Sequence, residues 1–402
     1  MPSSRYSLFL FSLIALTGCG LNTGDSSAYP FSADNEYIEP VDSIVIWIDE
    51  KTPHYLSGMR LMSADGMSTL VMINPLTKDY LIYDLSHADE KPKRVPLSSE
   101  GIHAIPRLST LVALGSYGQL KFLSINTATS FCYLLNDHGE ILKLINVDPL
   151  PEKADTAGAA ISFVTNPMYA VVRFENLIAV PCVPIERFEY KGPVNSLRIF
   201  DLNNEGFDYV SLHPFPSRFE NGIYGQHLCF TPLLAKYDSN TLIGGFAISD
   251  SFSLYNIHTL KKESTHVLSS RYFRADDAKP TMKPDEFVPN LAVKERLQYF
   301  DWLTPLHYKL VCDQRRKRTY LLSNAKPPTL ATVKERGGDY RMGSKHSIAI
   351  FDSAFRRGSE FLFNPDQYLT VSMEIIRGKL ALIPRSEYQP YEDSLVIHLF
   401  DL

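Results

Sequence analysis

A short aromatic stretch in the middle of the chain carries the side chains best suited to hold a ligand. Phe215, Phe219 and Tyr224 bring three rings close together in the sequence, with Arg218 and His227 beside them. Such rings can form platforms on which sugars stack. Packing between strands also explains aromatic residues, so both explanations stay open. We take Arg218, Tyr224 and His227 as the candidate ligand-binding residues.

The sequence lacks the motifs of common catalytic and metal sites. It contains no HExxH, no GxSxG, no EF-hand loop, no P-loop and no GxGxxG after a strand. Asp137, Asp201 and Asp352 could be combined into a carboxylate set, but each stands at a turn, where a carboxylate accepts backbone N–H bonds. The eleven histidines are scattered, and a lone histidine is more often a strand or turn residue than a ligand. We predict no catalytic residue, no metal ligand and no cofactor.

The N-terminus has the pattern of a lipoprotein signal peptide. Arg5 supplies a positive charge, and the apolar run that follows is too short to span a bilayer as a helix. The residues LTGC, ending at Cys19, look like the lipobox of bacterial lipoproteins, in which the cysteine thiol receives lipid and the signal is cut before it. We expect a signal peptide at 1–18 and a lipidated Cys19 that opens a flexible tether at 19–36.

The lipid anchor sets the expected location. Several acyl chains on one cysteine hold a protein stably on a membrane, because each buried methylene adds about 0.8 kcal/mol. No aspartate follows Cys19 directly, which by resemblance to lipoproteins of double-membraned bacteria favours the outer membrane. We expect a monomer anchored to the outer membrane, on either its periplasmic or its cell-surface side.

The charge balance argues against a nucleic-acid partner. The formal net charge is −5 at pH 7, whereas a nucleic-acid binder usually carries a basic surplus. The one dense basic cluster, at 315–318, lies between two strand-like runs and is interpreted as a solvated hairpin turn.

Four cysteines outside the signal segment are expected to be buried free thiols. Each lies in an apolar, strand-like setting, and no Cys or His spacing suggests zinc. An exported protein can also form disulfides, and four cysteines allow three full pairings, so the pairing stays open. The four are Cys132, Cys182, Cys229 and Cys312.

The elements that must position these side chains are short β-hairpins. Residues 131–135 and 141–145 are apolar runs on either side of a turn, in which Gly139 suits the positive φ that closes the loop. Similar units recur, and an acid or amide ends the third strand of each at intervals of about 63 residues, longer than a compact WD-type blade. These residues are Asp84, Asp137, Asp201, Asn256, Asp352 and Asp401.

Six such units predict an all-β fold, a six-bladed β-propeller that occupies 37–402 as a single domain. The strand at 44–48 is free to pair with the final strand at 395–400, which would close the ring and remove an exposed sheet edge. One short helix is expected around 291–297. A two-domain β-sandwich is the main structural alternative.

Four stretches resemble a known family. Residues 97–101, 212–219, 308–320 and 347–360 are similar to segments of uncharacterised six-bladed propeller lipoproteins from Bacteroidetes, a domain-of-unknown-function family with a TolB-like propeller. The last stretch, SIAIFDSAFRRGSE, matches best. The resemblance implies a lipid-anchored propeller, and because the family brings no known catalytic residues, it adds no site residue beyond Cys19.

Two functions of different classes are compatible with these sequence features. The first is a binding or interaction module that presents a loop-rich face to a glycan, a peptide or an envelope protein. The alternative is a metal-dependent hydrolase or lactonase in the propeller channel, which requires carboxylates and amides from several blades to converge. A structural scaffold with an apolar, plugged channel is a third interpretation.

Overall fold

The computed structural model describes residues 37–402 with internal gaps, of which the longest are 98–109, 147–160, 164–170, 185–194 and 336–343. Regular structure in the described part is mostly β-strand. The expected signal peptide at 1–18 and the tether at 19–36, with Cys19, lie outside the described residues. Among the helices that the structure describes, none combines the length and the apolar character needed to cross a membrane.

The described strands pair into six antiparallel sheets. One sheet contains β2 (Arg60–Ala64), β3 (Met67–Asn74), β4 (Asp79–Asp84) and β5 (Lys93–Pro96). The next contains β6 (Thr110–Leu114), β7 (Lys121–Asn126), β8 (Phe131–Leu135) and β9 (Ile141–Asn146). A third contains β10 (Ile161–Phe163), β11 (Val172–Phe174), β12 (Leu177–Pro184), β13 (Asn195–Asp201) and β14 (Tyr209–Pro214).

The C-terminal half supplies the other three sheets. One contains β15 (Pro232–Lys236), β16 (Thr241–Phe246), β17 (Ser251–Asn256) and β18 (Lys261–Val267). Another contains β19 (His307–Asp313), β20 (Arg318–Lys326), β21 (Lys345–Phe351) and β22 (Arg357–Phe363). The last contains β23 (Tyr368–Ile376), β24 (Lys379–Pro384), β25 (Ser394–Phe400) and, from the other end of the chain, β1 (Asp42–Trp47).

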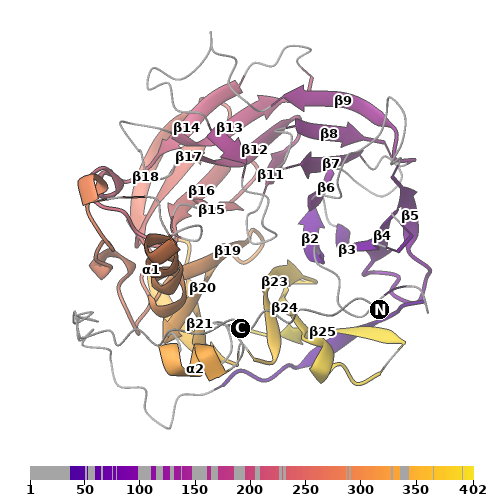
Figure 1. Ribbon diagram of the computed structural model, residues 1–402. Helices are drawn as coiled ribbons and strands as arrows, with labels where there is room; N and C mark the ends of the chain where they lie inside the picture. The colour runs from indigo at the N-terminus through magenta and orange to yellow at the C-terminus, as the bar shows by residue number, and fades with distance from the viewer. Residues whose placement is uncertain are drawn as a thin grey trace, which may run out of the picture.

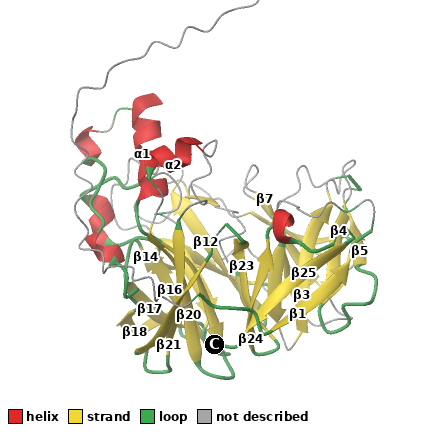
Figure 2. Cartoon of the chain, turned by 90° about the horizontal axis from the view of Figure 1, so that it is seen from below, coloured by secondary structure: helices red, strands yellow, loops and turns green. Residues whose placement is uncertain are grey.

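The sheets are arranged around a common centre as in a β-propeller (Figure 1). Strands β2, β6, β11, β15, β19 and β23 lie nearest that centre in the view of Figure 1. The helices α1 (Leu291–Leu303) and α2 (Leu330–Glu335) stand on one face of the layer of sheets, as Figure 2 shows. Helix α1 covers the short helix predicted at 291–297 and extends it. Short 3-10 helices occur at Ser217–Glu220, Ala275–Asp277, Pro284–Glu286 and Ser386–Tyr388.

The first described strand pairs with the last one, as the sequence predicts. Ile44 lies opposite Ile397 and Ile46 lies opposite Leu395 in the antiparallel pair β1–β25. Ile44 and Ile46 are buried, whereas the intervening Val45 is 36% exposed, so the strand shows the alternation of an edge with one covered face. The two ends of the described chain are thereby fixed in one sheet.

The core lies between the sheets. One cluster of buried apolar side chains includes members from all six sheets, such as Val71, Tyr133, Ile178, Phe246, Tyr320 and Phe400. A sheet that packs against a neighbour on each face buries both faces, which explains why strands such as β3 and β16 are buried almost continuously instead of at alternate residues.

Four acidic and amide residues at the strand ends act as turn residues, as the sequence predicts for Asp201 and Asp352. The Oδ1 atom of Asp84 accepts the backbone N–H of Ser86 at 2.8 Å, and Oδ1 of Asp352 accepts that of Ala354 at 2.9 Å. The same bond is made by Asp201 and Asn256. Asp137 lies outside the described residues. Gly139 of the same turn has the predicted positive φ, at 81°.

Candidate functional site

Strands of five sheets turn polar side chains toward the centre of the propeller. The inner strands β2 and β23 contact each other, as do β23 and β19, β19 and β15, and β15 and β11. Four segments near the centre, β2, β6, β11 and β15, are not predicted from the sequence, and neither is β10. Strands β2 (RLMSA) and β15 (PLLAK) are short and each has a charged residue at one end, Arg60 and Lys236, so neither forms the long apolar run by which a buried strand is identified.

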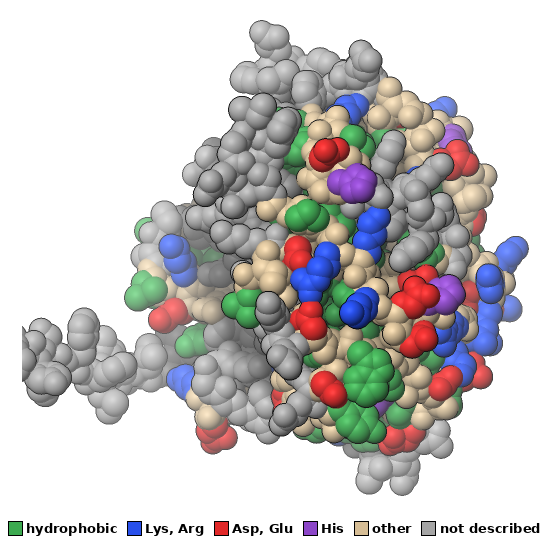
Figure 3. Space-filling view, turned by 90° about the vertical axis from the view of Figure 1, so that its right-hand side faces the viewer, with side chains coloured by type: hydrophobic (Ala, Val, Ile, Leu, Met, Phe, Trp, Pro, Cys, Tyr) green, Lys and Arg blue, Asp and Glu red, His purple; other side chains and the backbone are tan. Residues whose placement is uncertain are grey.

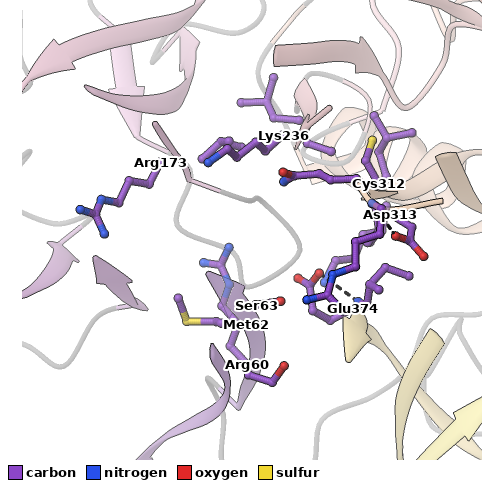
Figure 4. Close-up of a pocket in the computed structure, with 18 of the residues that line it drawn as sticks. Arg60, Met62, Ser63, Arg173, Lys236, Cys312, Asp313 and Glu374 are labelled. Carbon is purple, nitrogen blue, oxygen red and sulfur yellow. Dashed lines mark hydrogen bonds between the residues drawn. The ribbon is translucent and has the colours of Figure 1, made fainter. Parts of the chain in front are cut away.

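The inner strands β2, β11, β15, β19 and β23 contribute side chains to the wall of a cavity of about 720 Å³. The labelled side chains in Figure 4 surround one space, with Arg173 and Lys236 on one side, Arg60 and Ser63 on a second, and Glu374 on a third. Apolar side chains also contribute to the wall: Met62, Val171, Val172, Leu310 and Ile375. The volume is in the range of small-molecule binding sites in proteins.

The cavity lies toward the end of the channel opposite α1. Helix α1 leads into the beginning of β19, whereas the cavity residues Asp313 and Arg315 stand at the end of that strand and in the following turn. The turn residues Glu175 and Gly378 line it from two other sheets. The described residues of the long connections that carry α1 and α2 do not line this cavity.

Cations outnumber acids in the cavity wall. The cations are Arg60, Arg173, Lys236, Lys309, Arg315 and Arg377, and the acids are Glu175, Asp313 and Glu374. On the face of the molecule shown in Figure 3, by contrast, acidic and basic side chains are interspersed without a large patch of one sign. The excess of positive charge is thus a property of the cavity and not of that outer surface.

Three charged groups in the cavity wall influence one another directly. Arg60 and Lys309 are 8% and 7% exposed. Burial lowers the pKa of Lys309 to about 8, although the carboxylate of Glu374 opposes this shift. Burial also lowers the pKa of Arg60, against the attraction of Glu374, and raises the pKa of Glu374, against the attraction of Lys309 and Arg60. The cost of lost hydration therefore exceeds the attraction between Glu374 and the two cations.

The cations differ in how far the fold already occupies them. Arg173 donates from Nε to the carbonyl oxygen of Glu175 at 2.9 Å, and Lys236 lies over the ring of Phe174 with Nζ 5.3 Å from its centroid. The buried Nη1 of Arg60, by contrast, has no hydrogen-bond partner among the described residues. Arg60 is therefore the cation in the wall with a buried donor left to offer.

The cavity cysteine is not suited to nucleophilic chemistry. Cys312 is a free thiol, and burial raises its pKa to about 12, so that the thiolate is scarce at neutral pH. Cys229 is a free, buried thiol, as predicted, and its Sγ donates to Oδ1 of Asp301 at 3.3 Å, whereas the free Cys312 is only partly buried. The side chains of Cys132 and Cys182 lie outside the described part of the structure.

The residues proposed from the sequence for ligand binding lie elsewhere. Arg218 donates to the hydroxyl of Tyr224 at 3.1 Å and to the carbonyl oxygens of Ile248 and Asp276 at 2.7 and 3.1 Å, so it joins three segments of the chain. Tyr224 is 3% exposed. Neither residue lines the cavity, His227 lies outside the described residues, and a ligand role for these three residues stays a prediction.

Three residues reproduce the arrangement of a nucleophilic triad without access to substrate. Nδ1 of His307 lies 2.8 Å from the hydroxyl oxygen of Ser323, and its Nε2 lies 3.0 Å from Oδ1 of Asp250. The sequence predicts His307 only as a lone strand residue and gives no sign of this network. All three residues have no exposed surface. We therefore interpret the set as a structural network that connects the β16–β17 turn to β19 and β20.

The described residues show no gathering of metal ligands. Within the described part of the chain, no group of three or more His, Cys, Asp or Glu side chains is placed to hold a metal ion. The metal-dependent alternative therefore receives no support from the described part of the channel.

Comparisons with known proteins identify the fold. No protein-family model matches the chain, and no curated protein sequence does. A crystal structure of a DUF4221 family member from Bacteroides vulgatus ATCC 8482 covers 92% of this chain and 99% of its own length, with a TM-score of 0.68 and 18% identity. The chain folds like this DUF4221 protein. A second solved structure, from Bacteroides fragilis NCTC 9343, covers 93% of this chain and 98% of its own, with a TM-score of 0.53 and 9% identity. At these identities the likeness concerns the fold alone.

Proposed function

We propose that this protein is a ligand-binding β-propeller held outside the cytoplasm by a lipid on Cys19. The observation that carries the binding role is the central cavity of about 720 Å³, whose wall includes buried charged side chains. A buried charge costs stability unless a partner replaces its lost hydration. A ligand in the cavity would supply that partner. The proposed ligand is a glycan, a peptide or part of an envelope protein.

The proposed fold is a single TolB-like ring of six blades over residues 37–402. Six sheets are available as blades, and the contacts between inner strands connect four neighbouring pairs of sheets, with β2 also touching β6. The pair β1–β25 would close the ring, because it joins the first described strand to the last sheet. A closed ring would hold the cavity wall rigid.

The proposed location of the protein is the outer membrane, on its periplasmic or its cell-surface side. The sequence at residues 1–19 supports it through the short apolar run and the lipobox-like LTGC. The tether at 19–36 would let the propeller stand away from the lipid.

Membrane fractionation tests the anchor. Cys19→Ala in the full chain is expected to move the protein from the membrane fraction to the soluble extracytoplasmic fraction, because no acceptor thiol remains at that position. Ser26→Ala, in the tether, serves as the control and should stay with the membrane. Protease digestion of intact cells would then distinguish the two sides. An unmodified Cys19 in mass spectrometry of the membrane-bound protein would overturn the lipoprotein assignment.

A binding screen tests the module. The full chain, purified in detergent, is applied to a glycan array and a peptide array, and is mixed with solubilised envelope extract. We expect binding to at least one class, with loss of that binding when a cavity residue is replaced. The absence of binding in all three formats would contradict the proposal.

A further inference from the structure

The charge balance of the cavity indicates the chemistry of its ligand. Six cationic side chains and three acidic ones line the cavity. Of the six cations, Arg60 and Lys309 are buried, whereas Arg315 and Arg377 are exposed, so the cost of an uncompensated charge falls mainly on the two buried groups. An anionic ligand would remove that cost, whereas a cation would add to it and a neutral ligand would leave it unchanged.

Three charged side chains in the wall indicate where in the cavity an anionic group would bind. Arg60 comes from β2, Lys309 from β19 and Glu374 from β23, so three different sheets bring two cations and one carboxylate together. Burial raises the pKa of Glu374, which makes its carboxylate less able to neutralise both cations. One cationic group is left over even when Glu374 is ionised.

Arg60 provides a second observation in favour of an anionic ligand, independent of the count of charges. Arg60 is 8% exposed and lines the cavity, and its buried Nη1 has no hydrogen-bond partner among the described residues. Buried polar groups in folded proteins are nearly always hydrogen-bonded, and the exceptions call for an explanation such as a missing bound group. A guanidinium is also the side chain best matched to the geometry of carboxylate and phosphate groups.

We propose that the cavity binds a small organic anion of about sugar size, whose carboxylate or phosphate group accepts hydrogen bonds from Arg60, with Lys309 as the second cation beside it. This inference rests on the proposed function and gives the ligand class of the same site. The apolar side chains of Met62, Leu310 and Ile375 face the remainder of the ligand. Glu374 limits the affinity by competing for the same cations.

A set of three ligands that share one ring tests the charge requirement. Glucuronate, glucose 6-phosphate and glucose are titrated into the full chain in detergent at pH 7, followed by calorimetry. We expect glucuronate or glucose 6-phosphate to bind at least about 10-fold more tightly than glucose, since a hydrogen bond to a charged group adds that much or more. The two anions distinguish a carboxylate site from a phosphate site.

Two cavity variants with opposite expected effects exclude a purely structural explanation. Arg60→Gln should weaken binding of the preferred anion by about 10-fold or more, and Glu374→Gln should strengthen it, because a competing carboxylate is lost. Arg356→Gln is the control, since the Arg356 side chain is 81% exposed and pairs with Asp352 away from the cavity. Thermal denaturation checks that each variant is folded. If Arg60→Gln does not fold, Glu374→Gln alone still tests the prediction.

The outcomes separate this inference from the proposed function. Binding of a neutral glycan or peptide that is unaffected by Arg60→Gln, with none of the anions bound, would overturn the anion site and leave the binding module intact. Anion binding that is equal in Glu374→Gln and the original chain would place the anion away from the three charged groups and would also overturn the inference. Failure of every ligand in the screen would instead overturn the proposed function.

Discussion

At the scale of single residues, the buried polar groups of this protein mainly connect one sheet to the next. The carboxylate of Glu360 accepts hydrogen bonds from the hydroxyls of Ser270 and Ser347, at 2.5 and 2.7 Å, and from the backbone N–H of Arg271 at 2.6 Å. One acid thereby joins the segment after β18 to two strands of the following sheet. Such a set is fully satisfied, and therefore contributes to rigidity and specificity instead of reactivity.

The network of Asp250, His307 and Ser323 is expected to be structural as well, although Oδ2 of Asp250 has no hydrogen-bond partner among the described residues. His307→Ala leaves the buried carboxylate of Asp250 without its histidine partner, and should lower the free energy of unfolding by about 3–5 kcal/mol in chemical denaturation. The control is His258→Ala, at an exposed histidine, which should change it by less than about 0.5 kcal/mol.

A catalytic role would give a different result. Ser323→Ala would then abolish a hydrolytic activity of the protein while its stability stayed almost unchanged. Equal stability of His307→Ala and His258→Ala would contradict the structural interpretation of this network.

At the scale of elements, β1 shows how one strand from the N-terminal side completes a C-terminal sheet. Ile46 has no exposed surface and belongs to a core cluster with Leu395, Ile397 and other residues of that sheet and its neighbour. Its neighbour Val45 points outward. Adjacent positions of one strand therefore provide a matched pair for measuring what the covered face contributes.

Ile46→Ala should lower the free energy of unfolding by about 2–5 kcal/mol, because it removes a fully buried side chain and leaves a cavity. Val45→Ala, on the same strand, should cost less than about 1 kcal/mol, since that side chain is partly exposed. Urea denaturation of both variants measures the difference. Similar losses for the two would mean that β1 is not packed against the last sheet.

Two glycines with positive φ form a second matched pair. Gly139 and Gly378 have φ of 81° and 71°. A Cβ on Gly139 would collide with the carbonyl oxygen of Pro96, whereas a Cβ on Gly378 would meet nothing within 4 Å. Gly378→Ala is therefore expected to cost about 1–2 kcal/mol from backbone strain, and Gly139→Ala a further 1–3 kcal/mol from overpacking. Thermal denaturation should rank them in this order, and the reverse order would contradict close contact between that turn and β5.

At the scale of the whole molecule, the ring of sheets concentrates charge at its centre. Lys309 faces Arg60 from β2 and Glu374 from β23, with Lys236 of β15 and the acid Asp313 of its own strand also in the cavity wall. No single sheet contains this set. The titration of Lys309 therefore reports on the assembled centre.

The contribution of Lys309 to the stability of the protein should rise with pH between about 8 and 10.5. Lys309 has a pKa of about 8 in the folded protein and an ordinary value of 10.5, so in this interval the unfolded chain binds a proton that the folded protein does not. The slope should reach at most about 1.4 kcal/mol per pH unit. It should be absent in Lys309→Met and retained in Lys261→Met, at an exposed lysine.

Denaturant titrations at several pH values, compared between these variants, isolate this contribution from those of the thiols of Cys229 and Cys312 and of the tyrosines, whose raised pKa values make stability fall with pH in the same range. Stability that falls with pH only when Lys309 is present would contradict a buried lysine with a lowered pKa.

The sequence by itself determined the repeating part of the fold. Runs such as 80–85, 242–248 and 395–400 are apolar because both faces of these strands pack between sheets, and this continuous pattern can be recognised without a structure. The turn acids and the pairing of 44–48 with the last strand follow from local chemistry and from the need to cover a sheet edge.

Only the tertiary structure decided where the candidate site lies. Arg60, Lys309 and Glu374 are far apart in the chain, and they meet because the sheets are arranged around one centre. Inner strands such as β2 and β11 are short and carry charged side chains on the cavity wall, so they lack the hydrophobic pattern that marks a strand in a sequence. Charged side chains make these strands suitable for binding, and the same side chains prevent their recognition from hydrophobic patterns. A wall that contacts water or a ligand is under no requirement to be apolar.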